Sequence, residues 1–161
     1  WINSQYIKKM ELTQLCKFIK KYWNEMGWES PSTEWDLKLT NLIQDSMILL
    51  KDAIDQSKPF FILSQMKKEG EEFLESKKEV KDSLRYILFY LKEANITKVN
   101  KDNAREIINK ITVNHSIKKG ILMKSLRVAF FGCLSGPDLI QSWELFSENK
   151  TDIPLIERCN I

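Results

Sequence analysis

The stretch MKSLRVAFFGCLSGPDLIQSWELF, residues 123–146, decides how this chain folds. It begins as a cationic apolar segment, passes through Gly132 and Gly136, and continues as an amphipathic segment led by Pro137. Glycine ends helices because it enters the left-handed conformation without a Cβ penalty, and proline is favoured at the first helical position. The stretch therefore predicts two helices joined by a turn, with Gly132 closing the first, Pro137 at the first position of the second and Asp138 in its first turn.

Apolar residues at helical spacing recur through the rest of the chain, with no strand-like alternation. We predict that a helix ends at Gly27 and that a break lies at Pro59. Helix starts are predicted at Ser30–Thr33, at Asp45 or Ser46, and at Asn100. A further helix, which carries the apolar stripe of Leu84, Ile87, Leu88 and Leu91, is predicted to start near Gly70. The expected fold is all-α. Two small helical subdomains, residues 1–66 and 67–161, are divided at a polar hinge within 64–70.

Composition excludes several classes of site. The 161 residues carry a net charge of +3, three cysteines without a C-x-x-C pair and one histidine, so a usual zinc set cannot form and we expect reduced thiols. No apolar run reaches the ~18–20 residues that cross a bilayer and no signal peptide is visible, which favours a cytoplasmic protein. Because the first residue is Trp1, we expect a part of a longer chain.

Positive charge is concentrated in one window. No acidic residue lies between Glu106 and Asp138, whereas five cations do: Lys110, Lys118, Lys119, Lys124 and Arg127. A turn beside this window can offer peptide groups to unpaired bases while Lys124 and Arg127 neutralise phosphates or stack. On local chemistry alone, a Gly-Pro helix start is most often a simple chain reversal.

Three further features have ordinary readings. Phe130 and Phe131 are expected in the core, because aromatic residues beside aliphatic ones in a helix are usually buried. His115 is expected at the surface or in a loop. Glu71 and Glu72 are expected on a solvated helix face.

Two motifs carry a resemblance to a known family. The first motif consists of Met123–Ala129, Gly132 and Gly136–Leu139, and it resembles the final segment of bacterial-type glutamyl-tRNA synthetases. The sequence from Gly136 to Trp143 is most similar to the photosynthetic-bacterial and plastid branch of that family. The opening Trp1–Ile7 resembles the same family's Trp-x-Asn-x-x-Tyr-Ile segment just beyond the catalytic part. The resemblance spans nearly the whole chain, although only its two ends are specific.

The resemblance implies a fold, a partner and a site. It implies the all-helical anticodon-binding region of a class I glutamate–tRNA ligase, a monomer that binds tRNA, with ATP and Mg²⁺ used by a catalytic domain whose HIGH and KMSKS-type signatures are missing here. These residues alone are therefore expected to be inactive and to hold no cofactor. The residues that match the anticodon pocket are Ser135, Gly136, Pro137 and Leu139, and Arg127 matches a basic residue near the anticodon loop. Lys124, from the basic window, is the second cation expected beside the pocket.

One departure concerns the third anticodon base. Family members that reject glutamine tRNA have an arginine at the helix start that reads this base, and the alignment of helical stripes places Ser46 there. Serine cannot make the charge-assisted contact of arginine. The departure implies an enzyme that also glutamylates glutamine tRNA.

Two other function classes are considered. A free-standing helical module for protein or tRNA binding without catalysis would need an exposed apolar patch of several hundred Å² to dock a protein. The apolar stripes here are matched in number and can cover one another. An enzyme active on its own finds no support, because no nucleophile–base pair, metal set or phosphate loop is visible.

Overall fold

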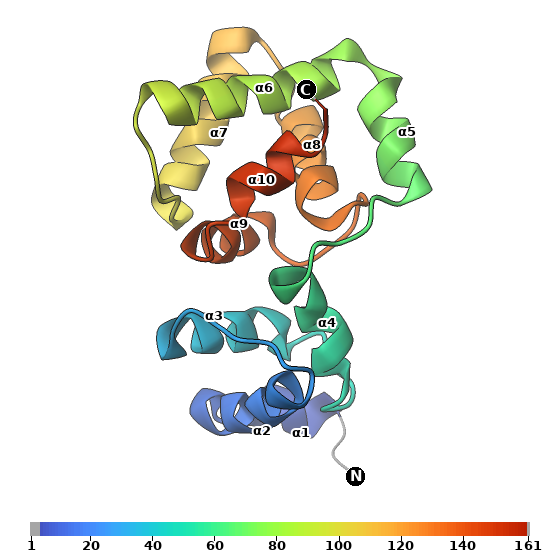
Figure 1. The fold of residues 1–161 in the computed structure, drawn as a ribbon, viewed down its shortest axis with the longest axis vertical. Helices are drawn as coiled ribbons and strands as arrows, with labels where there is room; N and C mark the ends of the chain where they lie inside the picture. Colours follow the sequence, from blue (N-terminus) through green and yellow to red (C-terminus); the bar gives the residue numbers. More distant parts are fainter. Residues whose placement is uncertain (1–3, 161) are drawn as a thin grey trace. The chain divides into compact units, whose positions relative to one another are not determined.

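The computed structural model describes residues 4–160, and this range contains ten helices and no strand (Figure 1). The all-α prediction is confirmed. The chain divides into two compact units, the first ending at Leu63 and the second beginning at Ser64, three residues before the predicted boundary. The first three residues of the Trp1–Ile7 motif lie outside the described residues. The helices are α1 Ser4–Lys9, α2 Leu12–Glu25, α3 Thr33–Gln44, α4 Asp52–Phe61, α5 Lys68–Ser76, α6 Lys78–Glu93, α7 Lys101–His115, α8 Lys119–Phe131, α9 Leu139–Glu148 and α10 Asp152–Glu157.

Unit 1 is built around aromatic rings. Helices α2, α3 and α4 pack against one another, and the ring centroid of Phe61 lies 5.2 Å from those of both Trp23 and Trp35. Ser32 caps α3 by accepting a 3.1 Å hydrogen bond from the Trp35 amide, and Gly27 follows α2 with a φ of +74°. The predicted end of the first long helix and the cap of the second are both confirmed.

Pro59 does not break a helix, and that prediction is wrong. It lies inside α4, two residues before the helix ends, where only the last turn loses a backbone hydrogen bond. Phe60 is 2% exposed and Phe61 packs among the tryptophans. Burial of these two rings outweighs the restriction that a proline places on Lys58 before it.

The connection between α3 and α4 is also longer than predicted. Neither Asp45 nor Ser46 is the N-cap of the next helix, because α4 starts at Asp52 and Asp45 is the C-cap of α3. The carboxylate of Asp52 accepts hydrogen bonds from the amides of Ile48 at 3.0 Å and Leu49 at 2.8 Å. This ordered loop of residues 45–51 carries Ser46.

Unit 2 is organised around α8. Helix α8 packs against each of α5, α6, α7, α9 and α10, which explains why the quoted stretch is so apolar. Phe130 is fully buried and Phe131 is 6% exposed, so both are core residues as predicted. The helix of the Leu84–Leu91 stripe starts at Lys78 and not near Gly70, because Lys77 is extended and separates α5 from α6.

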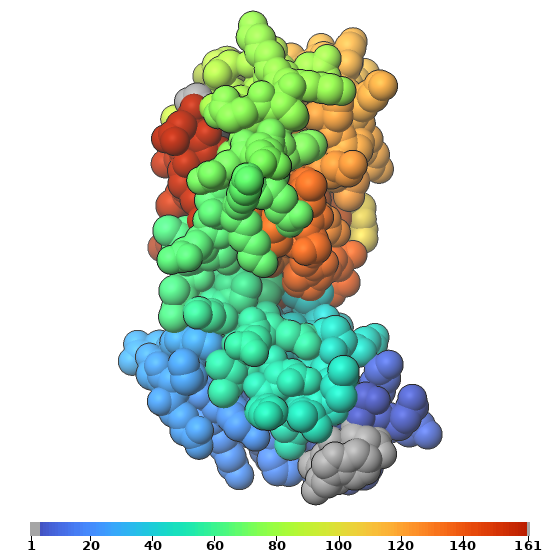
Figure 2. Space-filling model, turned by 90° about the vertical axis from the view of Figure 1, so that its right-hand side faces the viewer, coloured from blue at the N-terminus to red at the C-terminus, as the bar shows by residue number. Residues whose placement is uncertain are grey.

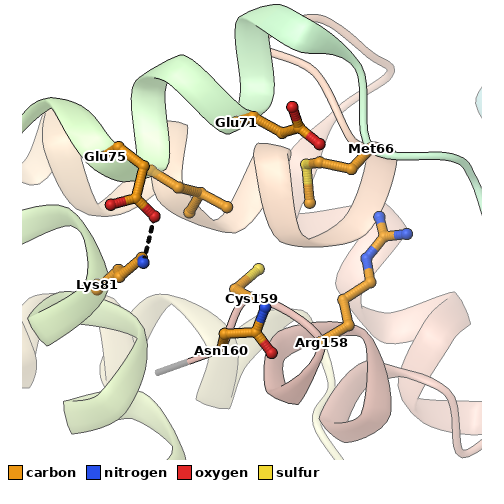
Figure 3. Close-up of a pocket in the computed structure, with 8 residues that line it drawn as sticks. Met66, Glu71, Glu75, Lys81, Arg158, Cys159 and Asn160 are labelled. Atoms are coloured by element: carbon orange, nitrogen blue, oxygen red, sulfur yellow. Dashed lines mark hydrogen bonds and ion pairs between the residues drawn. The ribbon is translucent and has the colours of Figure 1, made fainter.

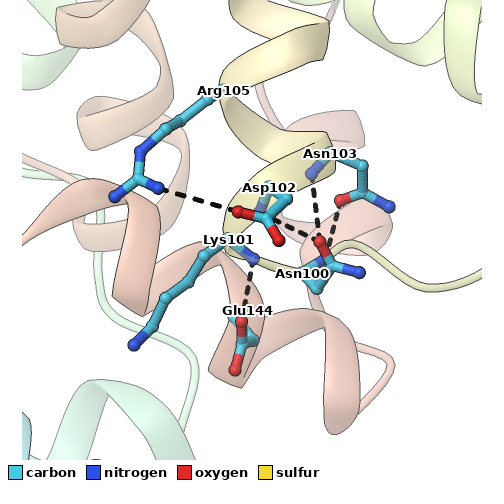
Figure 4. A network of polar contacts seen from close by, with 6 residues as sticks. All are labelled: Asn100, Lys101, Asp102, Asn103, Arg105 and Glu144. Carbon is cyan, nitrogen blue, oxygen red and sulfur yellow. Dashed lines mark hydrogen bonds and ion pairs between the residues drawn. The ribbon is translucent and has the colours of Figure 1, made fainter.

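The start of α7 is firmly capped (Figure 4). Asn100 accepts hydrogen bonds from the amides of Asp102 and Asn103, both at 3.0 Å, while the Asn103 side chain accepts from the Asn100 amide at 2.7 Å. Glu144 of α9 accepts from the Lys101 amide at 2.8 Å. The predicted cap at Asn100 is confirmed, and a buried carboxylate ties it to α9.

Candidate nucleic-acid interface

The elbow, residues 132–138, joins α8 to α9. Gly132 ends α8 in the left-handed conformation, with a φ of +73°, and its amide donates to the carbonyl of Val128 at 2.8 Å. A Cβ atom at Gly132 would overlap the carbonyl oxygen of Gln65 and lie 3.1 Å from Cα of Met66. The left-handed conformation favours glycine here, as the sequence predicts, and the close approach of residues 65–66 is a second requirement that only the structure shows.

A second glycine forms the tip of the elbow. A Cβ atom on Gly136 would lie 2.8 Å from Cδ2 of Phe131, inside the contact distance of two carbon atoms. Ser135 and Gly136 are exposed to solvent. Within the described residues, their N–H groups donate to no protein acceptor.

The second helix starts two residues later than predicted, at Leu139 and not at Pro137. Asp138 is the N-cap of α9, and its carboxylate accepts from the Gln141 amide at 2.9 Å. Pro137 therefore precedes the cap and is not at the first helical position. The side chain of Leu139 is 2% exposed, so of the predicted pocket residues it is the one whose side chain cannot reach a base.

Arg127 points at the elbow. Its Nη1 atom donates to the carbonyl oxygens of Gly136 at 3.2 Å and Pro137 at 2.8 Å. Lys124 is exposed one turn earlier on α8, at the i, i+3 spacing that places two side chains on one face. The structure thus brings five of the predicted site residues, Lys124, Arg127, Ser135, Gly136 and Pro137, to one corner of unit 2. The part of the chain that contains them is coloured in orange shades in Figure 2.

The other cations of the basic window lie elsewhere. Lys110 is on α7, where Nζ lies 2.8 Å from Glu106 and donates to the hydroxyl of Tyr90 at 3.0 Å; these two partners raise the pKa of the lysine. Lys118 and Lys119 are at the start of α8, about 20 Å from the elbow along a helix of thirteen residues. The window is therefore not one patch, and only Lys124 and Arg127 accompany the elbow.

Ser46, the residue predicted to face the third anticodon base, lies in unit 1. It is exposed in the 45–51 loop, where its hydroxyl donates to the carbonyl of Ile43 at 2.9 Å and contacts Oε1 of Gln56. Nε2 of Gln56 donates back to the Ser46 carbonyl at 3.1 Å. No cationic side chain occupies this position, as the sequence shows.

His115 and the acidic pair behave as predicted. His115 is exposed at the end of α7 and its ring stacks on Tyr86 with centroids 3.7 Å apart. Glu71 and Glu72 are exposed on α5. None of these side chains contributes to the elbow.

A pocket of about 400 Å³ lies between α5, the start of α6 and the end of α10 (Figure 3). Three of its four charged groups are engaged: Lys81 pairs with Glu75, and Arg158 donates to main-chain carbonyls. Cys159 lines it but is 3% exposed, and burial raises the pKa of its thiol. This pocket offers no reactive group.

Metal and membrane sites are not apparent in residues 4–160. No three His, Cys, Asp or Glu side chains of this range are grouped closely enough to hold a metal ion. Its helices are all too short or too polar to cross a bilayer. The cysteines Cys16, Cys133 and Cys159 are free and buried.

Sequence reasoning missed the side chains that hold the elbow from behind. Glu69 accepts a 3.2 Å hydrogen bond from the Leu134 amide, and Arg158 donates to the Ala129 carbonyl from Nε at 3.1 Å and Nη2 at 2.8 Å. Glu69 belongs to a run of acidic residues whose pattern indicates a solvent-exposed helix face, and Arg158 is a single cation near the end of the sequence. Neither has a local signal, because both contacts join residues far apart in the chain.

Comparison with known proteins decides the family. A family model described as an anticodon binding domain matches residues 11–152. The chain belongs to this anticodon-binding family. It is 96% identical, over 99% of its length, to 33% of the glutamate–tRNA ligase of Prochlorococcus marinus subsp. pastoris (strain CCMP1986 / NIES-2087 / MED4). It is 76% identical, over its whole length, to 34% of the ligase of strain MIT 9515.

The chain spans about a third of the length of these curated relatives. Among solved structures, a glutamate tRNA ligase from Elizabethkingia meningosepticum superimposes with a TM-score of 0.86 at 22% identity, covering 98% of this chain and 30% of that one. The synthetase of Elizabethkingia anophelis gives 0.77 at 21% over the same shares. These likenesses show the fold, and together with the near-identical relatives they confirm the predicted resemblance to the anticodon-binding region of glutamyl-tRNA synthetases.

Proposed function

We propose that this chain is the tRNA anticodon-recognition region of a glutamate–tRNA ligase, an enzyme that attaches glutamate to its tRNA using ATP. The observation that carries the proposal is the elbow, where the exposed residues Ser135 and Gly136 have N–H groups without a protein acceptor, beside Arg127 and Lys124. ATP and Mg²⁺ belong to the part of the ligase outside these residues, and the chain alone does not activate glutamate. We place the ligase in the cytoplasm as a monomer.

The elbow favours one hydrogen-bonding pattern. The carbonyls of Gly136 and Pro137 already accept from Arg127, whereas the N–H groups of Ser135 and Gly136 remain open. An unpaired anticodon base exposes its Watson–Crick edge, so a base that presents acceptors fits these donors. The rigid turn offers them at little entropic cost.

The cations beside the elbow supply affinity without base selectivity. Lys124 is exposed and can pair with a phosphate, a contact whose strength falls with salt concentration. Base contacts carry the selectivity and depend less on salt. Substitutions of the two kinds of residue should therefore have different signatures.

Filter binding of the full-length ligase to glutamate tRNA and to variants of its anticodon bases tests the proposal. Lys124→Ala should weaken binding to every tRNA by a similar factor and reduce the slope of affinity against salt by about 1. Gly136→Val forces the Phe131 ring and the elbow apart and should remove the preference for the cognate anticodon. Gly120→Val, at an exposed glycine of α8 with open space around it, is the control. Unchanged selectivity in a folded Gly136→Val protein refutes the elbow as the reading site.

A finer proposal concerns the third anticodon base. We propose that the ligase accepts glutamine tRNA as well as glutamate tRNA, because position 46 carries a serine hydroxyl bonded to Ile43 and Gln56 instead of a cation. Aminoacylation of the two purified tRNAs, compared side by side, tests it. Comparable kcat/KM values support the proposal, and rejection of glutamine tRNA by the unaltered enzyme refutes it. Ser46→Arg should shift the ratio towards glutamate tRNA.

A further inference from the structure

The back of the elbow is held by the first residues of unit 2. The amide of Lys67 donates to the Gly132 carbonyl at 2.9 Å, and the Leu134 amide donates to Oε1 of Glu69 at 3.2 Å. A Cβ atom on Gly70 would overlap the same Gly132 carbonyl and lie 2.9 Å from Sδ of Met66. We call residues 64–70 the brace. The brace therefore contacts the elbow at Gly132 and at Leu134, the two neighbours of Cys133.

The brace is itself anchored. Arg158 donates to the Ala129 carbonyl in the last turn of α8 and to the Ser64 carbonyl at the start of the brace. Its guanidinium is half-buried, and burial lowers its pKa from the ordinary value. The brace and the end of α8 are thus tied to one side chain of the α10 end.

Glu69 and Arg127 hold the exposed donors from opposite ends. Between them, Sγ of Cys133 donates to the Ser135 carbonyl at 3.3 Å. Glu69 fixes the amide of Leu134, one residue before Ser135, and Arg127 fixes the carbonyls of Gly136 and Pro137. The peptide groups with open N–H bonds lie between these two attachments. Loss of the Glu69 or the Arg127 attachment would allow these peptide groups to rotate, which would change the direction of their N–H groups.

We propose that Glu69 is a positioning residue for anticodon discrimination: by accepting the Leu134 amide it sets the direction of the open N–H groups at Ser135 and Gly136. This inference rests on the proposed function of the elbow. Glu69 does not touch the base. A carboxylate near a phosphate backbone weakens RNA binding by repulsion, so a role in selectivity separates positioning from simple electrostatics.

Three variants of the full-length ligase distinguish these effects. Glu69→Ala removes the acceptor and the charge, whereas Glu69→Gln removes the charge and keeps a side-chain oxygen that can accept the Leu134 amide. Glu71→Ala is the matched control, because Glu71 is an exposed carboxylate in the same first turn of α5 and bonds to no elbow residue. Both positions are at the surface, so the fold should persist.

The measurement is the ratio of dissociation constants for an anticodon-substituted tRNA and the cognate glutamate tRNA, with amide exchange of the peptide covering 132–138. Glu69→Ala should lower the ratio by about 3- to 10-fold, the net value of one typical hydrogen bond, and speed exchange. Glu69→Gln should stay within about twofold of the unaltered enzyme. Glu71→Ala should change overall affinity only.

The outcomes separate the inference from the function beneath it. A normal ratio in Glu69→Ala, while Gly136→Val loses selectivity, overturns the positioning role and leaves the elbow as the reading site. Equal losses in Glu69→Ala and Glu71→Ala also overturn it, because charge alone would explain them. No selectivity in the unaltered enzyme, or none lost in Gly136→Val, overturns the proposed function itself.

Discussion

Four glycines differ in whether an alanine in their place would have a strained backbone, a steric overlap, both or neither. Substituting each by alanine should therefore change the free energy of unfolding by a different amount. Gly120 has ordinary helical geometry and open space, and Gly27 has a φ of +74° and open space. Gly70 has helical geometry but no room for a Cβ atom, and Gly132 has both a φ of +73° and no room. The set therefore tests each cost alone and both together.

The magnitudes follow from the two costs. Gly120→Ala should stabilise by about 0.5–1 kcal/mol, since alanine is the better helix former. Gly27→Ala should cost about 1–2 kcal/mol for a left-handed non-glycine residue. In Gly70→Ala the overlap with a backbone oxygen, about 1–3 kcal/mol, is partly offset by helix propensity. Gly132→Ala should lose the sum of strain and overlap, about 2–5 kcal/mol.

Urea unfolding followed by circular dichroism and tryptophan fluorescence measures the free energies of unfolding. Trp143 is the one tryptophan of unit 2 in the sequence, so its signal reports the variants at Gly70, Gly120 and Gly132, and Gly27→Ala is read in the unit 1 transition. A Gly132→Ala protein that loses no more than Gly27→Ala would show that the elbow does not pack against residues 65–66. The brace would then have no structural basis.

Three further outcomes are expected. Asn100→Ala should cost about 1 kcal/mol in urea unfolding through loss of the α7 cap, whereas Asn109→Ala, at an exposed position inside the same helix, should not destabilise. Burial raises the pKa of Asp152 despite a 3.2 Å hydrogen bond from Trp143 Nε1. The folded state therefore binds the proton more tightly than the unfolded state, and the free energy of unfolding falls as pH rises above about 3.8. Asp152→Asn should remove this dependence of the free energy of unfolding on pH. The three buried thiols should react slowly with a thiol reagent in the native protein and quickly in urea, and fast native reaction would contradict their burial.

Local chemistry allowed much of the elbow to be predicted from sequence. Gly132 is left-handed because a helix must end before the chain can turn, and this requirement is visible as a glycine after an apolar run. The predicted start of α9 is two residues too early, because Pro137 is favoured at the first helical position and Asp138 is equally suited to be the N-cap. The hydrogen bond from Gln141 to the Asp138 carboxylate decides between them, and only the structure contains it.

The errors elsewhere have a common cause, which is tertiary packing that overrides a local preference. Pro59 stays helical because Phe60 is buried and the Phe61 ring packs on Trp23 of α2 and Trp35 of α3. The break at Lys77 has no glycine or proline, but it allows Leu74 and Val80 to be buried from two separate helices. Glu69 reaches Leu134 across 65 residues of sequence, a separation at which periodicity carries no information.

The contacts of Arg127 change what its removal would report. As a free cation it would contribute only a phosphate contact, and Arg127→Ala would weaken binding to every tRNA equally. Because Nη1 donates to the carbonyls of Gly136 and Pro137, the same substitution also releases the elbow and should lower anticodon selectivity. Lys124→Ala, on the same face but without these bonds, should lower affinity and leave selectivity unchanged. Equal selectivity in the two variants would mean that Arg127 acts by charge alone, and that Glu69 must hold the open N–H groups without it.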